Sequence, residues 1–236
     1  MKAVIFICYN RPEYFEKVLD NWKKQDVTDI DFYVNLDYID RKTFKIYYKH
    51  LHSFFKFIKQ DINERLQINN PKLGMAYNQF DASKRLFDLN YDFVIQAEDD
   101  VIPANDYIKY MSFMSEKFNN DDKVLSIHGF SMGNNLNDYR LKNQHLIFKK
   151  SCFNAWGWGT WKHKWNYLKS QWNFEDWDIE LTRRYSKDNK FGIYPRSSRS
   201  QNIGEKGEQM IDTIDKTFLQ TTVTDIFYNT DAYTIG

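Results

Sequence analysis

Three consecutive carboxylates, Glu98-Asp99-Asp100, directly follow the predicted strand Phe93–Ala97. Carboxylates this close together repel one another, and folding alone does not reward the arrangement. A hard divalent cation would relieve the repulsion, because Mg²⁺ or Mn²⁺ takes one or two protein carboxylates and completes its shell with water and phosphate oxygens. The alternative is an acidic turn at the positive end of a helix beginning near Pro103. The position after a strand favours the metal site.

A basic and an acidic residue follow two earlier strands. Arg11 comes shortly after the apolar run Ala3–Cys8, and Asp37 follows the predicted strand Ile30–Leu36. Ligands on an α/β sheet gather beyond the carboxyl ends of its parallel strands. We therefore expect Arg11, Asp37 and the three acids to share one edge of the sheet, where an arginine can bind phosphate through its fork of donors.

Strands and amphipathic helices alternate through the first half of the chain. Helical spacing begins at Pro12, a residue that the first turn of a helix accepts. Two further helices are predicted over Arg41–Lys59 and about Met75–Leu89, with a short strand near Arg65–Asn69 between them. This repetition predicts an α/β fold with a mostly parallel central sheet flanked by helices.

The second half of the chain is less regular. Its predicted elements are strands at Val124–Ile127, His145–Phe148, Phe191–Tyr194 and Thr222–Phe227, a helix entered from Ala155–Trp165, a helix at Trp177–Lys187, and a further helix within Gly204–Gly236. Because no linker or repeat divides the chain, we predict a single domain over residues 1–236, with the sheet half at 1–102 and the second half at 103–236.

The composition excludes several classes of protein. Among 236 residues, 33 Lys and Arg balance 32 Asp and Glu, so the chain is not a generally basic nucleic-acid-coating protein. An aromatic content of 18% with only 9 Gly and 4 Pro excludes disordered and collagen-like classes. Cys8 and Cys152 are too few for a disulfide framework, and no apolar run suits a signal peptide or a membrane span. We therefore expect a cytoplasmic protein with no integral membrane segment.

The order of these residues resembles that of GT-A glycosyltransferases. Tyr9-Asn10-Arg11-Pro12 after the first strand, an Asp after the second and the acids after a later one are similar to bacterial and viral family 2-type enzymes. A more distant likeness is to the β-1,2-N-acetylglucosaminyltransferase that begins complex N-glycans. Later segments extend the resemblance to about Gly207: Ala155–Lys162 with its Trp-Gly-Trp pattern, Phe174–Trp177, and Tyr194-Pro195 with Asn202–Gly204.

The resemblance implies the GT-A fold, with a nucleotide-sugar-binding half at residues 1–102 and a smaller acceptor and catalytic half at 103–236. It also implies a role for each matching residue: Asp100 as the metal ligand, Asp99 and Glu98 at the ribose, donor sugar or metal-bound water, Arg11 at the diphosphate, Asp37 at the base, Gly74 and Asn78 at the donor, and Gly157 and Trp158 at the sugar and acceptor pocket.

The implied cofactor is Mn²⁺ or Mg²⁺, and the implied donor is a nucleotide sugar, with a UDP-sugar favoured. Many relatives carry a His soon after their Asn-Ile-Gly element, but Gly204–Met210 contains none. We therefore expect metal binding to depend on Asp100 and phosphate oxygens, with Glu208 as a further candidate ligand.

Transfer of a sugar needs a base for the acceptor hydroxyl. Displacement of a nucleoside diphosphate gives the sugar oxocarbenium character, as in glycoside hydrolysis, and a carboxylate on the opposite face must take the proton. Glu175 and Asp176 are the candidates, and we favour Asp176. A base at this position implies in-line attack and inversion of the anomeric centre.

The acceptor and two other functions stay open at this stage. The acceptor hydroxyl is expected on a glycan, but a hydroxymethylated DNA base is also permitted, as in viral enzymes that act in the host cytoplasm, by the basic residues Arg183, Arg184, Lys187, Lys190, Arg196 and Arg199. A nucleotidyltransferase is the first alternative function, although Tyr9–Pro12 is not a Gly-rich phosphate loop. A non-catalytic carbohydrate-binding protein is the second. The sequence predicts nothing about oligomeric state.

Overall fold

The computed structural model describes residues 1–131, 147–196 and 198–204. The predicted helix and strand within Gly204–Gly236, and the candidate ligand Glu208, lie outside the described residues. Within them, no helix is long and apolar enough to cross a membrane.

The helices and strands of the first half follow the predicted alternation. They are β1 (Lys2–Cys8), α1 (Pro12–Trp22), β2 (Ile30–Leu36), α2 (Arg41–Ile58), α3 (Ile62–Arg65), β3 (Leu66–Ile68), α4 (Met75–Asp88) and β4 (Phe93–Glu98). The second half contains β5 (Val101–Pro103), α5 (Tyr107–Lys117), β6 (Val124–His128), β7 (Ile147–Lys150), β8 (Trp158–Trp161), α6 (Lys162–Ser170), α7 (Trp177–Lys187), β9 (Phe191–Pro195) and β10 (Ser200–Asn202).

The main sheet of the described chain has the strand order β3-β2-β1-β4-β8-β6-β9-β7. Strands β3, β2, β1 and β4 are parallel, β8 runs antiparallel to both β4 and β6, and β9 is parallel to β6. A separate antiparallel pair joins β5 to β10. The predicted α/β fold with a mostly parallel sheet is therefore confirmed.

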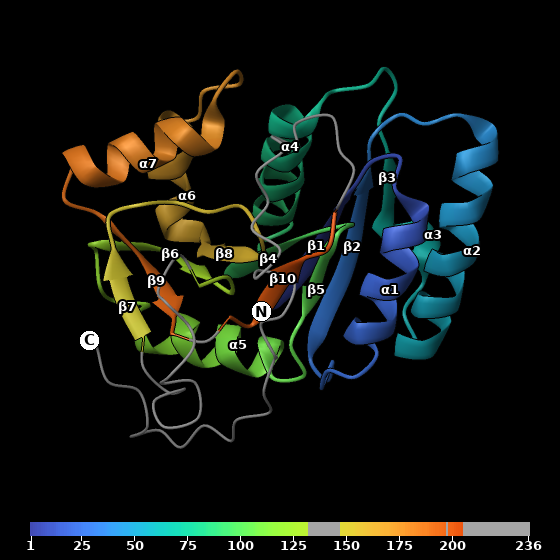
Figure 1. Cartoon of the computed structure of the whole chain (residues 1–236), viewed down its shortest axis with the longest axis horizontal. Helices are drawn as coiled ribbons and strands as arrows, with labels where there is room; N and C mark the ends of the chain where they lie inside the picture. The colour runs from blue at the N-terminus through green and yellow to red at the C-terminus, as the bar shows by residue number, and fades with distance from the viewer. Residues whose placement is uncertain (132–146, 197, 205–236) are drawn as a thin grey trace.

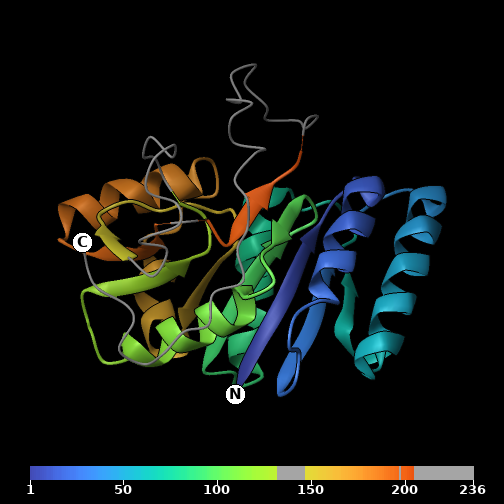
Figure 2. The same ribbon diagram turned by 60° about the horizontal axis from the view of Figure 1, so that its bottom comes forward.

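Alternating side chains of β1 divide the core into two layers. Val4 and Phe6 belong to the cluster that packs under α1, α2 and α5, whereas Ala3 and Ile5 belong to the cluster under α4, α6 and α7. Strand side chains alternate between the two faces of a sheet, so a continuous apolar run is what a strand covered on both faces requires. Figures 1 and 2 show these helices covering the two faces.

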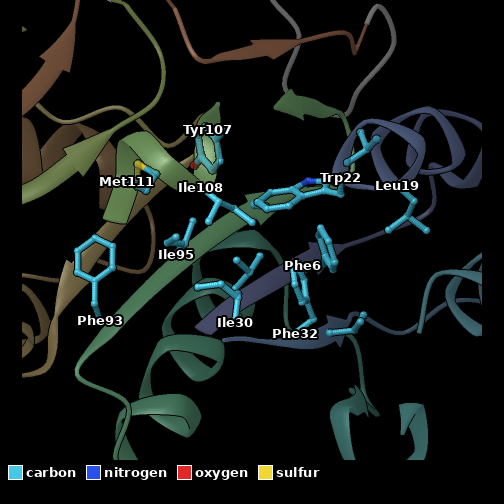
Figure 3. Packing of buried hydrophobic residues seen from close by; sticks show 14 of the residues in the cluster. Phe6, Leu19, Trp22, Ile30, Phe32, Phe93, Ile95, Tyr107, Ile108 and Met111 are labelled. Carbon is cyan, nitrogen blue, oxygen red and sulfur yellow. The ribbon is translucent and has the colours of Figure 1, made fainter. Parts of the chain in front are cut away.

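The first layer is rich in aromatic rings that pack edge to face. The Phe6 ring centroid lies 5.4 Å from that of Trp22 and 5.7 Å from that of Phe54. Trp22 in turn lies 5.5 Å from Tyr107, and this contact joins α1 to α5 on the same face of the sheet (Figure 3). These contacts pack α1, α2 and α5 against one face of the sheet around β1.

The helix predicted to be entered from Ala155–Trp165 is confirmed as α6, but residues Trp158–Trp161 before it form strand β8 between β4 and β6, which was not predicted. Gly159 explains the pairing, because a Cβ there would lie 2.7 Å from the Phe93 ring and hold the strands apart. Near Pro103 the chain forms β5 and not a helix, since α5 begins only at Tyr107. The acids therefore do not cap a helix.

Candidate active site

Asp99 lies at the junction of β1 and β4 and is fully buried. Its carboxylate accepts hydrogen bonds from the Tyr9 amide and the Tyr47 hydroxyl, both at 2.7 Å, and pairs with Arg11 Nη2 at 2.8 Å. The two strands are parallel neighbours, so their carboxyl ends meet, as expected from the sequence. The bonds from Tyr9 and Arg11 anchor the chain after β1 to the chain after β4, and the bond from Tyr47 adds α2 to this junction.

Arg11 binds two of the three acids at once. Besides its bond to Asp99, its Nη1 donates to Asp100 Oδ2. The arginine stands just before α1, and its amide donates to the Tyr47 hydroxyl at 2.8 Å. The repulsion that suggested a cation is thus relieved in part by Arg11, a contact between residues 89 positions apart.

Glu98 faces the opposite side of the sheet. Its Oε1 accepts a hydrogen bond from Gln79 Nε2 on α4 at 2.8 Å, away from Arg11. Burial, with the nearby Asp100 charge, raises the pKa of Glu98 to about 8, and burial likewise raises the pKa of Asp99 to about 7. The three carboxylates therefore do not form one cage, and the described residues contain no group of three His, Cys, Asp or Glu side chains suited to a metal.

Asp100 fits a metal bound through a single carboxylate. Its Oδ2 contacts Arg11 and the Asn202 amide, whereas its Oδ1 is buried with no hydrogen-bond partner in the described part of the chain. An unpaired buried oxygen costs free energy, so this oxygen is one that can accept a bond from a ligand. Mg²⁺ and Mn²⁺ can bind through one protein carboxylate when phosphates and water complete the shell.

Strand β10 brings the carboxyl-terminal segment onto Asp100. The Ile203 amide donates to the Asp100 carbonyl at 2.8 Å, and the Gly204 amide donates to Asn202 Oδ1 at 2.7 Å. A Cβ on Gly204 would lie only 2.3 Å from Asp100 Oδ2. Asn202 belongs to the Asn202–Gly204 segment that resembles the family, but we did not predict a role for it from the sequence.

Asp37 holds the loop that leads into α4. Its two carboxylate oxygens accept hydrogen bonds from the amides of Leu73 and Gly74, each at 2.8 Å. Gly74 has φ +81°, a conformation that glycine adopts without strain, and no atom of the described residues lies within 4 Å of where its Cβ would be. The approach of a donor to the Gly74 backbone and the bond from Asp37 to a nucleotide base both stay predictions.

Asn78 lies beneath the same loop in a buried amide network. Its Oδ1 accepts a hydrogen bond from Asn69 Nδ2 at 2.8 Å, and Asn35 Nδ2 lies 3.4 Å from the same oxygen. Asn78 therefore helps to hold Asn69, and with it the start of this loop, in place. Its contact with a donor stays a prediction.

Gly157 and Trp158 lie at the start of β8. Gly157 has φ +79°, and a Cβ there would lie 2.9 Å from the Tyr107 hydroxyl. The Trp158 ring is fully buried, 4.8 Å from Phe153, so the described structure places it in the core. The neighbouring Trp156 is only partly buried. A sugar contact by Gly157 or Trp158 stays a prediction.

Glu175 and Asp176 are exposed and immediately precede α7. The ring before them, Phe174, stacks on Tyr77 with centroids 3.9 Å apart. Tyr77 belongs to the first turn of α4, directly after Gly74. The structure thus brings the two acids to the end of α4 that adjoins the Asp37 loop.

Comparison with known proteins finds a matching family model and solved structures of similar fold. The GNT-I family matches residues 72–233. The mannosyltransferase PcManGT from Pyrobaculum calidifontis, solved with GDP-Man and Mn²⁺, has 15% identity and a TM-score of 0.55 over 82% of this chain and 54% of its own. S. aureus TarS 1–349 has 14% identity and a TM-score of 0.55 over 84% and 61%.

TarS 1–349 in complex with UDP-GlcNAc has 13% identity and a TM-score of 0.52 over 82% of this chain and 58% of its own. At these identities the likeness establishes the fold, which is the GT-A glycosyltransferase fold. This chain spans between about half and three fifths of the length of these solved chains. No curated protein matches the sequence.

Proposed function

The chain belongs to the GNT-I family, and from that premise we propose that it is a metal-dependent inverting glycosyltransferase that moves a sugar from a nucleotide sugar, preferably a UDP-sugar, to a hydroxyl acceptor. The observation that carries the proposal is the cluster of Arg11, Asp99 and Asp100 where β1 and β4 end, next to the loop held by Asp37. An arginine and a carboxylate with an unpaired oxygen are the groups that bind a diphosphate and its cation.

The donor is proposed to bind along this edge. Arg11 binds the diphosphate, Asp37 accepts a hydrogen bond from the base, Gly74 and Asn78 lie at the donor, and Asp99 and Glu98 are assigned to the ribose, the donor sugar or metal-bound water. Asp100 would hold Mn²⁺ or Mg²⁺, which when bound stabilises the negative charge of the leaving diphosphate. Support comes from the fold relatives, whose descriptions name GDP-Man with Mn²⁺ and UDP-GlcNAc.

The acceptor is proposed to enter from the side of residues 103–236, with Gly157 and Trp158 near its pocket. Asp176, or else Glu175, takes the proton from its hydroxyl, and attack opposite the leaving group inverts the anomeric carbon. Their exposure beside α4 supports this placement. We propose a glycan acceptor. Steep loss of activity with rising salt would instead favour a hydroxymethylated base in DNA, because phosphate contacts release counterions.

A ligand screen followed by a turnover assay tests the proposal. UDP-, GDP- and dTDP-sugars are added with and without Mn²⁺, and a ligand that binds only the folded protein should raise the melting temperature. We expect a Mn²⁺-dependent rise with one UDP-sugar and release of UDP, both lost in Asp100→Asn and kept in the exposed variant Glu13→Gln. Stabilisation without release would indicate a binding protein, and pyrophosphate release from a nucleoside triphosphate a nucleotidyltransferase.

A further inference from the structure

The two exposed acids lie between two anchored aromatic rings. Trp177, after them, is buried and stacks on Trp172 with centroids 4.5 Å apart and the planes 14° from parallel. Phe174, before them, stacks face to face on Tyr77 at 3.9 Å and 13°. Glu175 and Asp176 are therefore open to solvent, while the chain is held on both sides of them.

The two anchors differ in what they depend on. Trp177 belongs to the core under α6 and α7, so its place follows from folding of that layer. Phe174 lies on the chain between α6 and α7 and is held by α4, through Tyr77 and, edge to face at 5.2 Å, through Phe80. A local hydrogen bond from the Glu175 amide to Asn173 Oδ1 at 3.0 Å fixes the turn but does not tie it to α4.

Tyr77 connects this anchor to the donor loop. It stands three residues after Gly74, about one helical turn, and the Gly74 amide is bound by Asp37. Its side chain is 49% exposed, so the ring adds little to the core, unlike Phe80, which also packs on Trp165 and Trp172. An exposed ring stacked on a residue 97 positions away couples the loop after β3 to the acids before α7.

We propose that Tyr77 is a positioning residue, whose ring holds Phe174 and thereby fixes Asp176 and Glu175 relative to the donor loop. The inference rests on the proposed function, because it concerns the residues assigned there as the base. A general base must lie within hydrogen-bond reach of the acceptor hydroxyl, and a displacement of about 1 Å can lower a rate on the order of 100-fold. The stack of Phe174 on Tyr77 fixes the position of the chain that carries these two exposed side chains.

Three single variants separate positioning from folding. Tyr77→Ala removes the stack, Tyr77→Phe keeps the ring without its hydroxyl, and Phe57→Ala removes a comparably exposed aromatic ring from α2. We expect Tyr77→Ala to lower kcat about 10- to 100-fold with the KM for donor within about twofold. Tyr77→Phe and Phe57→Ala should stay within about twofold of the wild type in both.

A double variant tests whether Tyr77 acts through the base. In an Asp176→Asn background, Tyr77→Ala should lower kcat little further, because the group that it positions is already gone. A full additional loss in the double variant would show that Tyr77 acts by another route and would overturn the inference.

Amide hydrogen exchange provides a readout that does not depend on turnover. Tyr77→Ala should speed exchange at Phe174–Asp176 at least about tenfold and leave β1 and β4 unchanged. Unchanged exchange at these residues, or unchanged kcat, contradicts the inference. If the wild-type protein turns over no nucleotide sugar, the proposed function fails, and the exchange result still decides whether Tyr77 holds the segment.

Discussion

At the scale of single residues, the candidate site is dominated by buried charge. Arg11 pairs with both Asp99 and Asp100, whereas in the described part of the chain Glu98 is held by the neutral amide of Gln79. Burial of an ionisable group disfavours its charged form, so a carboxylate kept in such a place lowers the stability of the folded protein at high pH. A charged Glu98 at the site therefore lowers the stability of the folded protein at high pH.

Asp176→Asn tests the proposed base. Asparagine keeps the size of the side chain but cannot accept the proton, so we expect turnover to fall by about 100- to 10,000-fold while donor affinity stays within about threefold. Steady-state kinetics and calorimetric titration with the donor measure the two effects. Loss of donor binding would contradict the role, and the same experiment on Glu175→Gln shows which of the two acids carries it.

Glu98→Gln tests the cost of the buried acid. The pKa of Glu98 is raised to about 8 in the folded protein, above the ordinary 4.5, so the folded chain keeps a proton that the unfolded chain releases. Stability from this group is full below about pH 4.5 and is lost as the pH rises toward 8. In urea unfolding with EDTA, we expect Glu98→Gln to be more stable than wild type by on the order of 2 kcal/mol at pH 8.5, with little difference at pH 5. Glu13→Gln is the exposed control, and a difference independent of pH would refute the cause.

At the scale of elements, the short pair β5–β10 completes the site. It places Asn202 and Gly204 against Asp100, although about 100 residues separate these segments. The pair is too short to be recognised from periodicity, since each strand has three residues. Its contribution is to bring Asn202 and Gly204 against the Oδ2 atom of Asp100, which Arg11 also contacts.

Gly204→Ala tests this closure. A Cβ at 2.3 Å from Asp100 Oδ2 must displace that carboxylate. We expect the affinity for Mn²⁺ with the nucleotide sugar to fall at least about tenfold, and the free energy of unfolding to fall by about 1–2 kcal/mol. Titration calorimetry measures the first and urea unfolding the second. Ile203→Val, one position earlier, should change neither, and normal affinity in Gly204→Ala would show that Asp100 does not need this contact.

At the scale of the whole molecule, the sheet separates the two layers of the core. Phe6 is central to the layer under α1, α2 and α5, where its ring packs on Phe15, Trp22 and Phe54. The same strand sends Ile5 into the other layer. A change at Phe6 therefore acts on the strand that carries Arg11 to the site.

Phe6→Ala should lower the free energy of unfolding by about 3–5 kcal/mol, because the lost contacts leave a cavity among rigid rings. Phe6→Leu should cost less, and Phe57→Ala, at a surface position, less than about 0.5 kcal/mol. Urea unfolding followed by tryptophan fluorescence measures all three. Equal losses in Phe6→Ala and Phe57→Ala would mean that Phe6 is not part of a close-packed core.

The sequence was sufficient for elements whose pattern is local. Strand β2 at Ile30–Leu36 and helix α7 at Trp177–Lys187 have the predicted bounds, because apolar side chains at strand or helix spacing stop at polar residues. It also predicted that Arg11 and the acids would meet, since the carboxyl ends of parallel strands share an edge. Strand β8 could not be predicted in this way, because its tryptophans fit helical spacing and its pairing depends on Gly159 lying against Phe93.

By itself the sequence determined the order of strands and helices along most of the first half of the chain, and with it the edge of the sheet where the acids lie. Only the tertiary structure decided that Glu98 faces Gln79 while Asp99 faces Arg11, and that Phe174 rests on Tyr77. The physical reason is that these partners come from distant parts of the chain, so their contacts depend on how whole layers pack and not on any local pattern of residues.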